Sequence, residues 1–117
     1  MQLTLLKSKI HRARVTGSEL GYEGSITLPR DLMDKANILA HEQVDILNVN
    51  NGARFTTYVI EQPAGSSNIT INGPAARLVQ VDDVIIVCAY AGMSEDEARN
   101  WEPTVLLMNP DDNSVKG

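Results

Sequence analysis

The feature that most limits the fold is a pair of extended runs joined by a tight turn. Residues 43–49 and 54–60 are rich in β-branched and aromatic side chains, and Asn50-Asn51-Gly52 lies between them. Asn-Gly between two such runs is a strong β-hairpin signal, because both residues accept the positive φ angles that the turn needs. The sequence therefore predicts two antiparallel strands in the middle of the chain.

Further extended runs of the same kind occupy most of the remaining chain. They are separated by turn signals rich in glycine, proline, asparagine and aspartate, and they cover residues 3–15, 25–28, 68–72, 84–90 and 103–108. The run 84–90 is the most apolar, which predicts a strand buried on both faces at the centre of the core. About seven short strands favour a β barrel, since closure removes exposed edges in so small a domain.

The predicted helices are few and short. One opens at Pro29 and ends at Asn37, and one turn is expected at residues 75–78. A third begins at Ser94, where Glu97 completes a capping box. With 117 residues the chain fits a single domain spanning 1–117. The polar, aperiodic stretch 109–117 is expected to be a mobile tail.

Composition excludes several classes of protein. The net charge of -5 argues against a nucleic-acid binder, and the longest apolar runs fall short of the roughly 20 residues of a membrane-spanning helix. With one cysteine and no signal-like start, the expected location is the cytoplasm. Cys88 lies in the apolar run and is expected to pack there.

The first predicted strand is basic. Lys7, Lys9 and His11 alternate along it and therefore share one face. A solvated edge strand explains this pattern, because lysines on an edge prevent association between sheets. The other interpretation is that this face binds an anion.

Common catalytic arrangements are weakly represented. No metal site is expected, because the chain has two histidines in different contexts and a single cysteine. A phosphate-binding glycine loop is not indicated either, since Gly21-Tyr22-Glu23-Gly24 lacks the lysine and the spacing. A Ser-His-Asp triad with Ser25 and His11 is compatible with residue types, but the surroundings of Ser25 do not resemble a nucleophile elbow.

Five motifs occur together in one order along most of the chain. They are Lys9-x-His11-Arg12, Tyr22-x-Gly24-Ser25, Asn51-Gly52-x-Arg54-x-x-Thr57-Tyr58, Asn72-Gly73-x-Ala75-Ala76 and Met93-Ser94-x-x-Glu97-Ala98-Arg99. Through these motifs the chain resembles the bacterial aspartate 1-decarboxylases, pyruvoyl-dependent enzymes that make β-alanine for pantothenate biosynthesis. Gly-Ser alone is a common dipeptide and carries no such information.

The resemblance implies a double-psi β barrel and a homotetramer with active sites between subunits. It also implies autocatalytic cleavage at Gly24-Ser25 into chains 1–24 and 25–117, with Ser25 converted to a pyruvoyl cofactor. L-Aspartate would form a Schiff base with that group and lose CO2. A maturation factor is a further partner that the resemblance leaves open.

The resemblance also assigns roles to individual residues. Gly24, Ser25 and Thr57 would take part in processing, and Tyr58 would be the proton donor. Substrate-binding positions are Lys9, Arg54, Thr57, Asn72, Gly73 and Ala75, with His11 and Tyr22 in support and no metal.

Three points depart from a simple match. Strand alternation places Thr57 and Tyr58 on opposite faces, although both carry family roles. Leu47 stands where some relatives have tryptophan. Pro74 stands where alanine is usual, and it removes a backbone donor beside the Asn72-Gly73 turn. The alternative function is an unprocessed, non-catalytic barrel that serves as a binding or assembly module.

Overall fold

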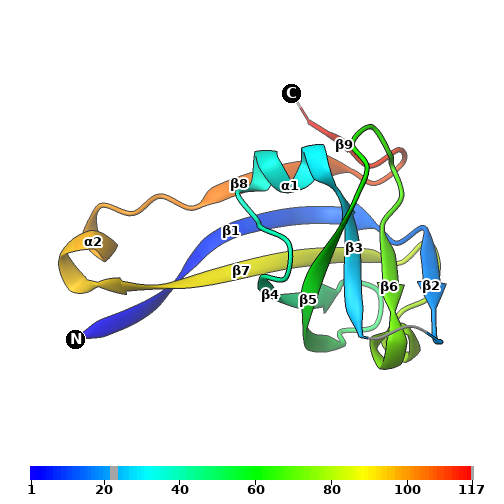
Figure 1. The fold of residues 1–117 in the computed structure, drawn as a ribbon, viewed down its shortest axis with the longest axis horizontal. Coiled ribbons are helices and arrows are strands. Elements are labelled where there is room, and N and C mark those ends of the chain that lie inside the picture. The colour runs from blue at the N-terminus through cyan, green and yellow to red at the C-terminus, as the bar shows by residue number, and fades with distance from the viewer. Residues whose placement is uncertain (22–23, 117) are drawn as a thin grey trace.

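Strands dominate the computed structural model, which describes residues 1–21 and 24–116 (Figure 1). The described part contains nine strands, two more than the sequence predicts, because β2 and β9 are too short to show a period. The strands are β1 (Gln2–Arg14), β2 (Gly17–Glu19), β3 (Ser25–Pro29), β4 (Gln43–Asn48), β5 (Arg54–Gln62), β6 (Thr70–Asn72), β7 (Val84–Ser94), β8 (Thr104–Asn109) and β9 (Ser114–Val115).

Within the described residues three short helices join these strands, as the sequence predicts. They are α1 (Arg30–Ala36), the 3-10 helix η1 (Gly73–Leu78) and α2 (Glu95–Arg99). Asn37 ends α1 in the left-handed conformation, with φ of 59°. Within residues 1–21 and 24–116, no helix has the length and apolarity needed to cross a membrane.

The strands form one sheet in the order β2-β6-β3-β5-β4-β7-β1-β8-β9. Just after β1, the Thr16 backbone N–H donates to the Ile69 carbonyl oxygen at 2.8 Å, and the Ile69 N–H donates to Thr16 Oγ1 at 2.9 Å. Ile69 directly precedes β6. These hydrogen bonds join β6 to the end of β1, so the six strands β6, β3, β5, β4, β7 and β1 form a closed ring. The predicted barrel closure is confirmed.

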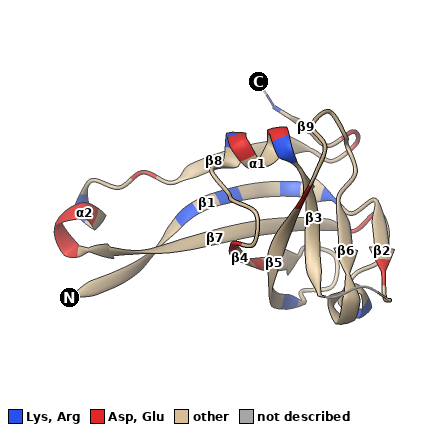
Figure 2. Ribbon diagram, in the orientation of Figure 1, with Lys and Arg blue, Asp and Glu red and all other residues tan. Residues whose placement is uncertain are grey.

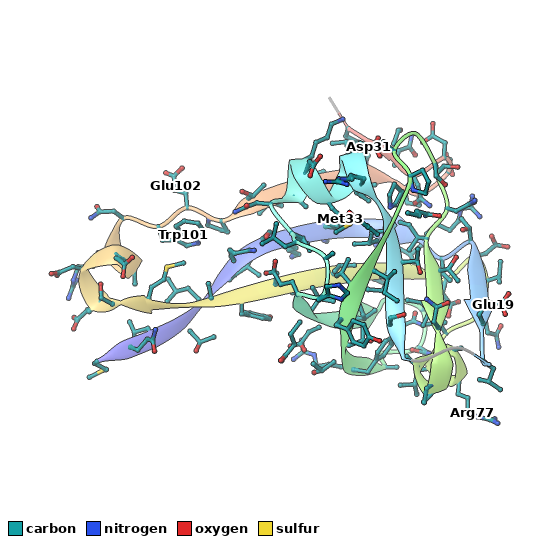
Figure 3. The ribbon with its side chains drawn as sticks, in the orientation of Figure 1. Glu19, Asp31, Met33, Arg77, Trp101 and Glu102 are labelled. Carbon is teal, nitrogen blue, oxygen red and sulfur yellow. The ribbon has the colours of Figure 1, made fainter. Side chains whose placement is uncertain are left out.

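The core is filled by aliphatic side chains from alternate strand positions. Those with no exposed surface include Ile10, Ile26, Leu28, Ile46, Val59, Ile71, Ile85 and Val87. Helix α1 covers one side of the sheet and buries Leu32, Met33 and Ala36 as predicted (Figure 3). We call the opposite side of the barrel strands, which points away from this core, the outer face.

The predicted central hairpin is confirmed. Strands β4 and β5 are antiparallel, with Asp45 opposite Thr56 and Leu47 opposite Arg54. Gly52 in the connecting turn has φ of 77°, a value that glycine adopts without steric cost.

Strand β7 lies between β4 and β1, and Ile85, Val87 and Ala89 are fully buried. Cys88 is 6% exposed and packs as predicted, but Tyr90 is 44% exposed. The strand runs four residues beyond the predicted end, because its last part pairs with the start of β1 in an arm that projects from the barrel (Figure 1).

Local contacts secure the arm. At its tip the capping box of α2 is present, since the Glu97 N–H donates to Ser94 Oγ and the Ser94 N–H donates to Glu97 Oε1. The indole N–H of Trp101 donates to the Leu6 carbonyl oxygen at 2.9 Å (Figure 3).

Strand β1 is not an edge strand. It lies between β7 and β8, so protection of an edge does not explain its basic residues. The Lys7 ammonium pairs with the Glu42 carboxylate at 2.6 Å. Lys9 and His11 are half-buried on the outer face, in alternation with the buried Ser8 and Ile10.

Residues 109–116 continue the sheet where the sequence predicts a mobile tail; Gly117 lies outside the described residues. Met108 pairs with Val115 across a tight turn. Asn113 adopts φ of 58°, its Oδ1 accepts from the Arg14 N–H at 2.7 Å, and its Nδ2 donates to the Arg14 and Ser67 carbonyl oxygens. These long-range hydrogen bonds, which have no periodic apolar signature, hold the segment.

Replacing Asn113 with alanine is expected to lower the free energy of unfolding by about 2 kcal/mol, because a partly buried Arg14 N–H loses its acceptor. Chemical denaturation measures this loss. Asp111→Ala changes an exposed side chain of the same turn and serves as the control, with an expected change within about 0.5 kcal/mol. Equal stability of the two variants would contradict the role given to Asn113.

Candidate active site

The Ser25 hydroxyl belongs to a buried polar cluster at the start of β3. Ser25 has no exposed surface, and its Oγ accepts a hydrogen bond from Asn72 Nδ2 at 3.0 Å. The same amide donates to Thr27 Oγ1 at 2.9 Å. Asn72 is itself only 6% exposed. One asparagine amide therefore holds two hydroxyl groups of a single strand.

The strand period produces this cluster. Ile26 and Leu28 point into the core, so Ser25 and Thr27 point to the outer face. Ser25 is opposite Asn72 in the antiparallel pair of β3 and β6, and opposite residues of such a pair point to the same side. Thr27 is a residue that the sequence analysis missed, although its place two residues after Ser25 predicts a shared face.

Strand β5 lies on the other side of β3 and runs parallel to it, with Ile26 opposite Val59. Continuing this register by one and two residues places Tyr58 beside Ser25 and Thr57 beside Gly24. Thr57 is opposite the buried Val44 and lies on the core side, whereas Tyr58 lies on the outer face. The predicted alternation is present, and the two residues have different neighbours.

The turn after Asn72 lies against Gly24. Gly73 starts η1 with φ of 69°, which favours glycine at this position. A Cβ added to Gly24 would lie 3.6 Å from Pro74 Cδ, which is ordinary contact. Ala75 is partly buried and packs against the core. The residues 72–75 therefore form one wall of the Ser25 cluster.

A second group of candidate residues lies on the outer face of other strands. Lys9 is opposite Cys88, and Cys88 is opposite Asp45. In the next row His11 is opposite Ile86 on β7, Ile86 is opposite Leu47, and Leu47 is opposite Arg54 on β5. Figure 2 shows the basic residues along β1 and at the start of β5. These registers place Lys9 and Arg54 on either side of β7.

Leu47 and Ile86 also line a hollow of about 370 Å³ beside exposed Arg54. A tryptophan at position 47 would be much larger than this leucine. The hollow gives the Arg54 guanidinium an apolar wall and open space on the same side.

Burial and nearby charge favour the neutral forms of two groups on this face. Desolvation, followed by the positive charges of Lys9, Arg12 and Lys116, lowers the pKa of His11 below its usual range. The His11 Nδ1 atom is buried and has no hydrogen-bond partner among the described residues. Burial raises the pKa of Cys88, against smaller opposing effects of its hydrogen bond with Tyr90 and of Lys9.

Lys9 and His11 lie on β1, a strand that does not pair with β3. Strands β5, β4 and β7 lie between β3 and β1 in one direction round the barrel, and β6 lies between them in the other. Tyr22 lies outside the described residues. Across residues 1–21 and 24–116, no cluster of three or more histidine, cysteine, aspartate or glutamate side chains is arranged to hold a metal ion.

Asn72→Ala is expected to lower the free energy of unfolding by about 1–3 kcal/mol, because Ser25 and Thr27 both lose a buried donor. Denaturation of an uncut Ser25→Ala background isolates the Thr27 part of this effect. Thr27→Val is the matched control: it removes one acceptor while keeping the shape of the side chain, and a smaller loss is expected. A loss for Thr27→Val larger than that for Asn72→Ala would contradict the central place of the amide.

Comparison with known proteins agrees with this geometry. A family model described as aspartate decarboxylase matches residues 1–116. The aspartate 1-decarboxylase of Caulobacter vibrioides is 59% identical over 109 residues, which cover 93% of this chain and 92% of that protein. The aspartate 1-decarboxylase of Phenylobacterium zucineum is 56% identical over 116 residues, which cover 99% of this chain and 98% of that protein.

A solved structure supports the fold alone. The rationally designed mkDPBB_sym_86 protein, a double-psi β barrel, has a TM-score of 0.50 and 14% identity, over 66% of this chain and 90% of that chain. The predicted double-psi β barrel is confirmed. With a family model over nearly its whole length and relatives of more than half identical sequence, the chain belongs to the aspartate decarboxylase family.

Proposed function

We propose that this protein decarboxylates L-aspartate to β-alanine and CO2, and so supplies β-alanine for pantothenate biosynthesis. The observation that carries the proposal is the buried Ser25–Asn72 pair directly after Gly24, in a chain 59% identical to an aspartate 1-decarboxylase. Ser25 would be the precursor of a pyruvoyl group. A hydroxyl held by an amide donor, next to a glycine carbonyl, suits conversion by the chain itself.

The first step is an N-to-O acyl shift. Ser25 Oγ attacks the Gly24 carbonyl carbon, a C–O bond forms, the Gly24–Ser25 C–N bond breaks, and the hydroxyl proton passes to the released amine. Loss of the Ser25 Cα proton then breaks the Cβ–O bond and frees the Gly24 carboxylate. Water hydrolyses the remaining residue 25 with release of ammonia, which leaves the pyruvoyl group at the new N-terminus.

Thr57 is the proposed donor to the oxyanion formed on the Gly24 carbonyl. Its support is that the register of β3 and β5, extended by two residues beyond Ile26 and Val59, would set Thr57 beside Gly24. Removing one such donor often raises the free energy of the transition state by about 3 kcal/mol. Tyr58, one residue further, neighbours Ser25 and is the proposed proton donor to the carbon left after CO2 departs. Thr57 and Tyr58 lie on opposite faces of β5, and in this proposal Thr57 acts in chain cleavage and Tyr58 in the decarboxylation reaction.

Burial explains why cleavage must come first. In the continuous chain Ser25 has no exposed surface, so a dissolved amino acid has no contact with it. Breaking the bond after Gly24 gives residue 25 a free end and relieves it of one covalent neighbour. When present, the pyruvoyl group supplies a carbonyl that withdraws electrons from the bond to the departing carboxylate. Asn72, Gly73 and Ala75 would hold it and the substrate.

The substrate carries two carboxylates and needs cationic partners. Arg54 can bind one of them with two parallel hydrogen bonds, and Lys9 offers a point charge. Lys9 lies on β1, which does not pair with the strand of Ser25 in its own chain. We therefore infer a homotetramer in which the outer face of one subunit brings Lys9, with His11 in support, to Ser25 of another. Tyr22, which belongs to the motif Tyr22-x-Gly24-Ser25, is proposed as a further supporting residue.

Intact-mass analysis tests the processing. The purified protein is expected to give two chains, residues 1–24 and a pyruvoyl-blocked 25–117, because Ser25 cuts the bond before it. Ser25→Ala is expected to give one uncut, folded and inactive chain. β-Alanine formation by Ser25→Ala would refute the mechanism, and a parent chain that stays uncut after long incubation would favour the non-catalytic module or a required maturation factor.

Arg54→Ala tests substrate binding. The variant is expected to process normally but to show a KM for aspartate about 10- to 100-fold higher, since hydrogen bonds to a charged group are lost. Steady-state release of CO2 measures this change. Arg30→Ala on α1, which removes only an exposed ion pair with Glu61, is the control. A normal KM for Arg54→Ala would remove Arg54 from the site.

A further inference from the structure

The outer face that carries Lys9, His11 and Arg54 extends past β1 to the end of the chain. His11 is opposite Leu107 on β8, and the Lys116 N–H donates to the Leu107 carbonyl oxygen at 2.7 Å. Lys116 thus continues the row that runs from Arg54 through His11. Val115 packs toward the core, so the alternation of the strand places Lys116 on the outer face.

Firm contacts hold Lys116 in this row. Val115 pairs with Met108, whose side chain is 1% exposed. The turn before it is tied to β1 through Asn113 and Arg14. A lysine so placed has a defined position relative to His11, unlike a lysine in a mobile tail.

The charge of Lys116 is not compensated by any described carboxylate. Ion pairs of the described residues join Lys7 to Glu42, Arg14 to Asp82, Arg30 to Glu61 and Arg99 to Glu95, and none includes Lys9 or Lys116. The Lys9 and Lys116 ammonium groups both act on the His11 imidazole. Uncompensated positive charges on one face attract a dicarboxylate and raise its local concentration.

We propose that Lys116 belongs to the cationic row of this face, and that together with Lys9 and Arg54 it attracts the two carboxylates of aspartate at long range. The second part of the proposal is that the charge of Lys116 reaches the His11 imidazole, which lies in the same row. This inference rests on the proposed function. Lys116 is exposed and lies two strands from His11, so its effect is a long-range one on binding and not on the chemical step. Lys116 therefore strengthens the attraction of the substrate to this face and acts through its charge on His11.

The groups around His11 make the second part testable. Its own strand presents Lys9 and Arg12, and the neighbouring β7 presents Ile86 opposite it with Cys88 one row away. On β8 the outer residues are Val105 and Leu107, which carry no charge. Lys116 is therefore the one cation acting on His11 from outside β1 among the described residues.

The experiment compares Lys116→Gln, Lys116→Glu and Lys116→Arg with the parent protein. At low ionic strength Lys116→Gln is expected to raise the KM for aspartate about two- to fivefold at constant kcat, and Lys116→Glu more, because an attractive charge is lost or reversed. The difference should shrink below about twofold at 0.5 M salt, where the Debye length is only a few ångströms. Lys116→Arg should restore the parent KM.

A second measurement does not depend on turnover. NMR titration in a His41→Gln background follows His11 alone, and its pKa should rise in Lys116→Gln while staying low in Lys116→Arg. Lys35→Gln, which removes an exposed cation on α1, should change neither the KM nor the pKa of His11. Absence of β-alanine from the parent would refute the proposed function, and the titration would still decide whether the charge reaches His11.

The proposal is overturned if Lys116→Gln keeps the parent KM at low ionic strength, or if the pKa of His11 is the same in both proteins. A fall in kcat with unchanged KM would also overturn it, since that result assigns Lys116 to the chemical step. Mass analysis of each variant confirms complete processing, so that altered maturation is not mistaken for altered binding.

Discussion

The hydrogen bond between Asn72 and Ser25 is the constraint on which the site depends. It exists because β3 is paired on both sides, with β6 setting the partner of Ser25 and β5 setting the neighbours of Gly24. A shift of either strand by one residue would turn the buried hydroxyl toward the core and its aliphatic neighbour outward. The fully buried Ile26 and Ile71 in the same strands oppose such a shift.

Local signals in the sequence were sufficient for much of the fold. The Asn50-Asn51-Gly52 turn, the left-handed Asn37 and the Ser94–Glu97 capping box each act within a few residues, and the structure contains all of them. Gly24, Ser25 and Asn72 were recognised by motif, and their proximity follows from the register of β3 and β6. The motifs do not include Thr27, so they did not predict the hydrogen bond that Asn72 donates to it.

Long-range order was harder to predict, because it depends on which strands become neighbours. The basic pattern of β1 suits an edge strand equally well, and only the pairing with β8 excludes that location. The last residues carry too few apolar side chains to show a period, yet Asn113 bonds to Arg14 across 99 positions of the chain. The placement of Lys9 and Ser25 on strands that do not pair likewise reflects sheet order, which residue spacing does not encode.

The position of β1 inside the sheet affects how the molecule would respond to a break after residue 24. Ile10 fills the core, and the strand is hydrogen-bonded to β7 on one side and to β8 on the other. The shorter piece would thus remain inserted in the longer one without a covalent link, and both would unfold in a single transition. After such a break the barrel would consist of two fragments, and each would supply strands with which the other must pair.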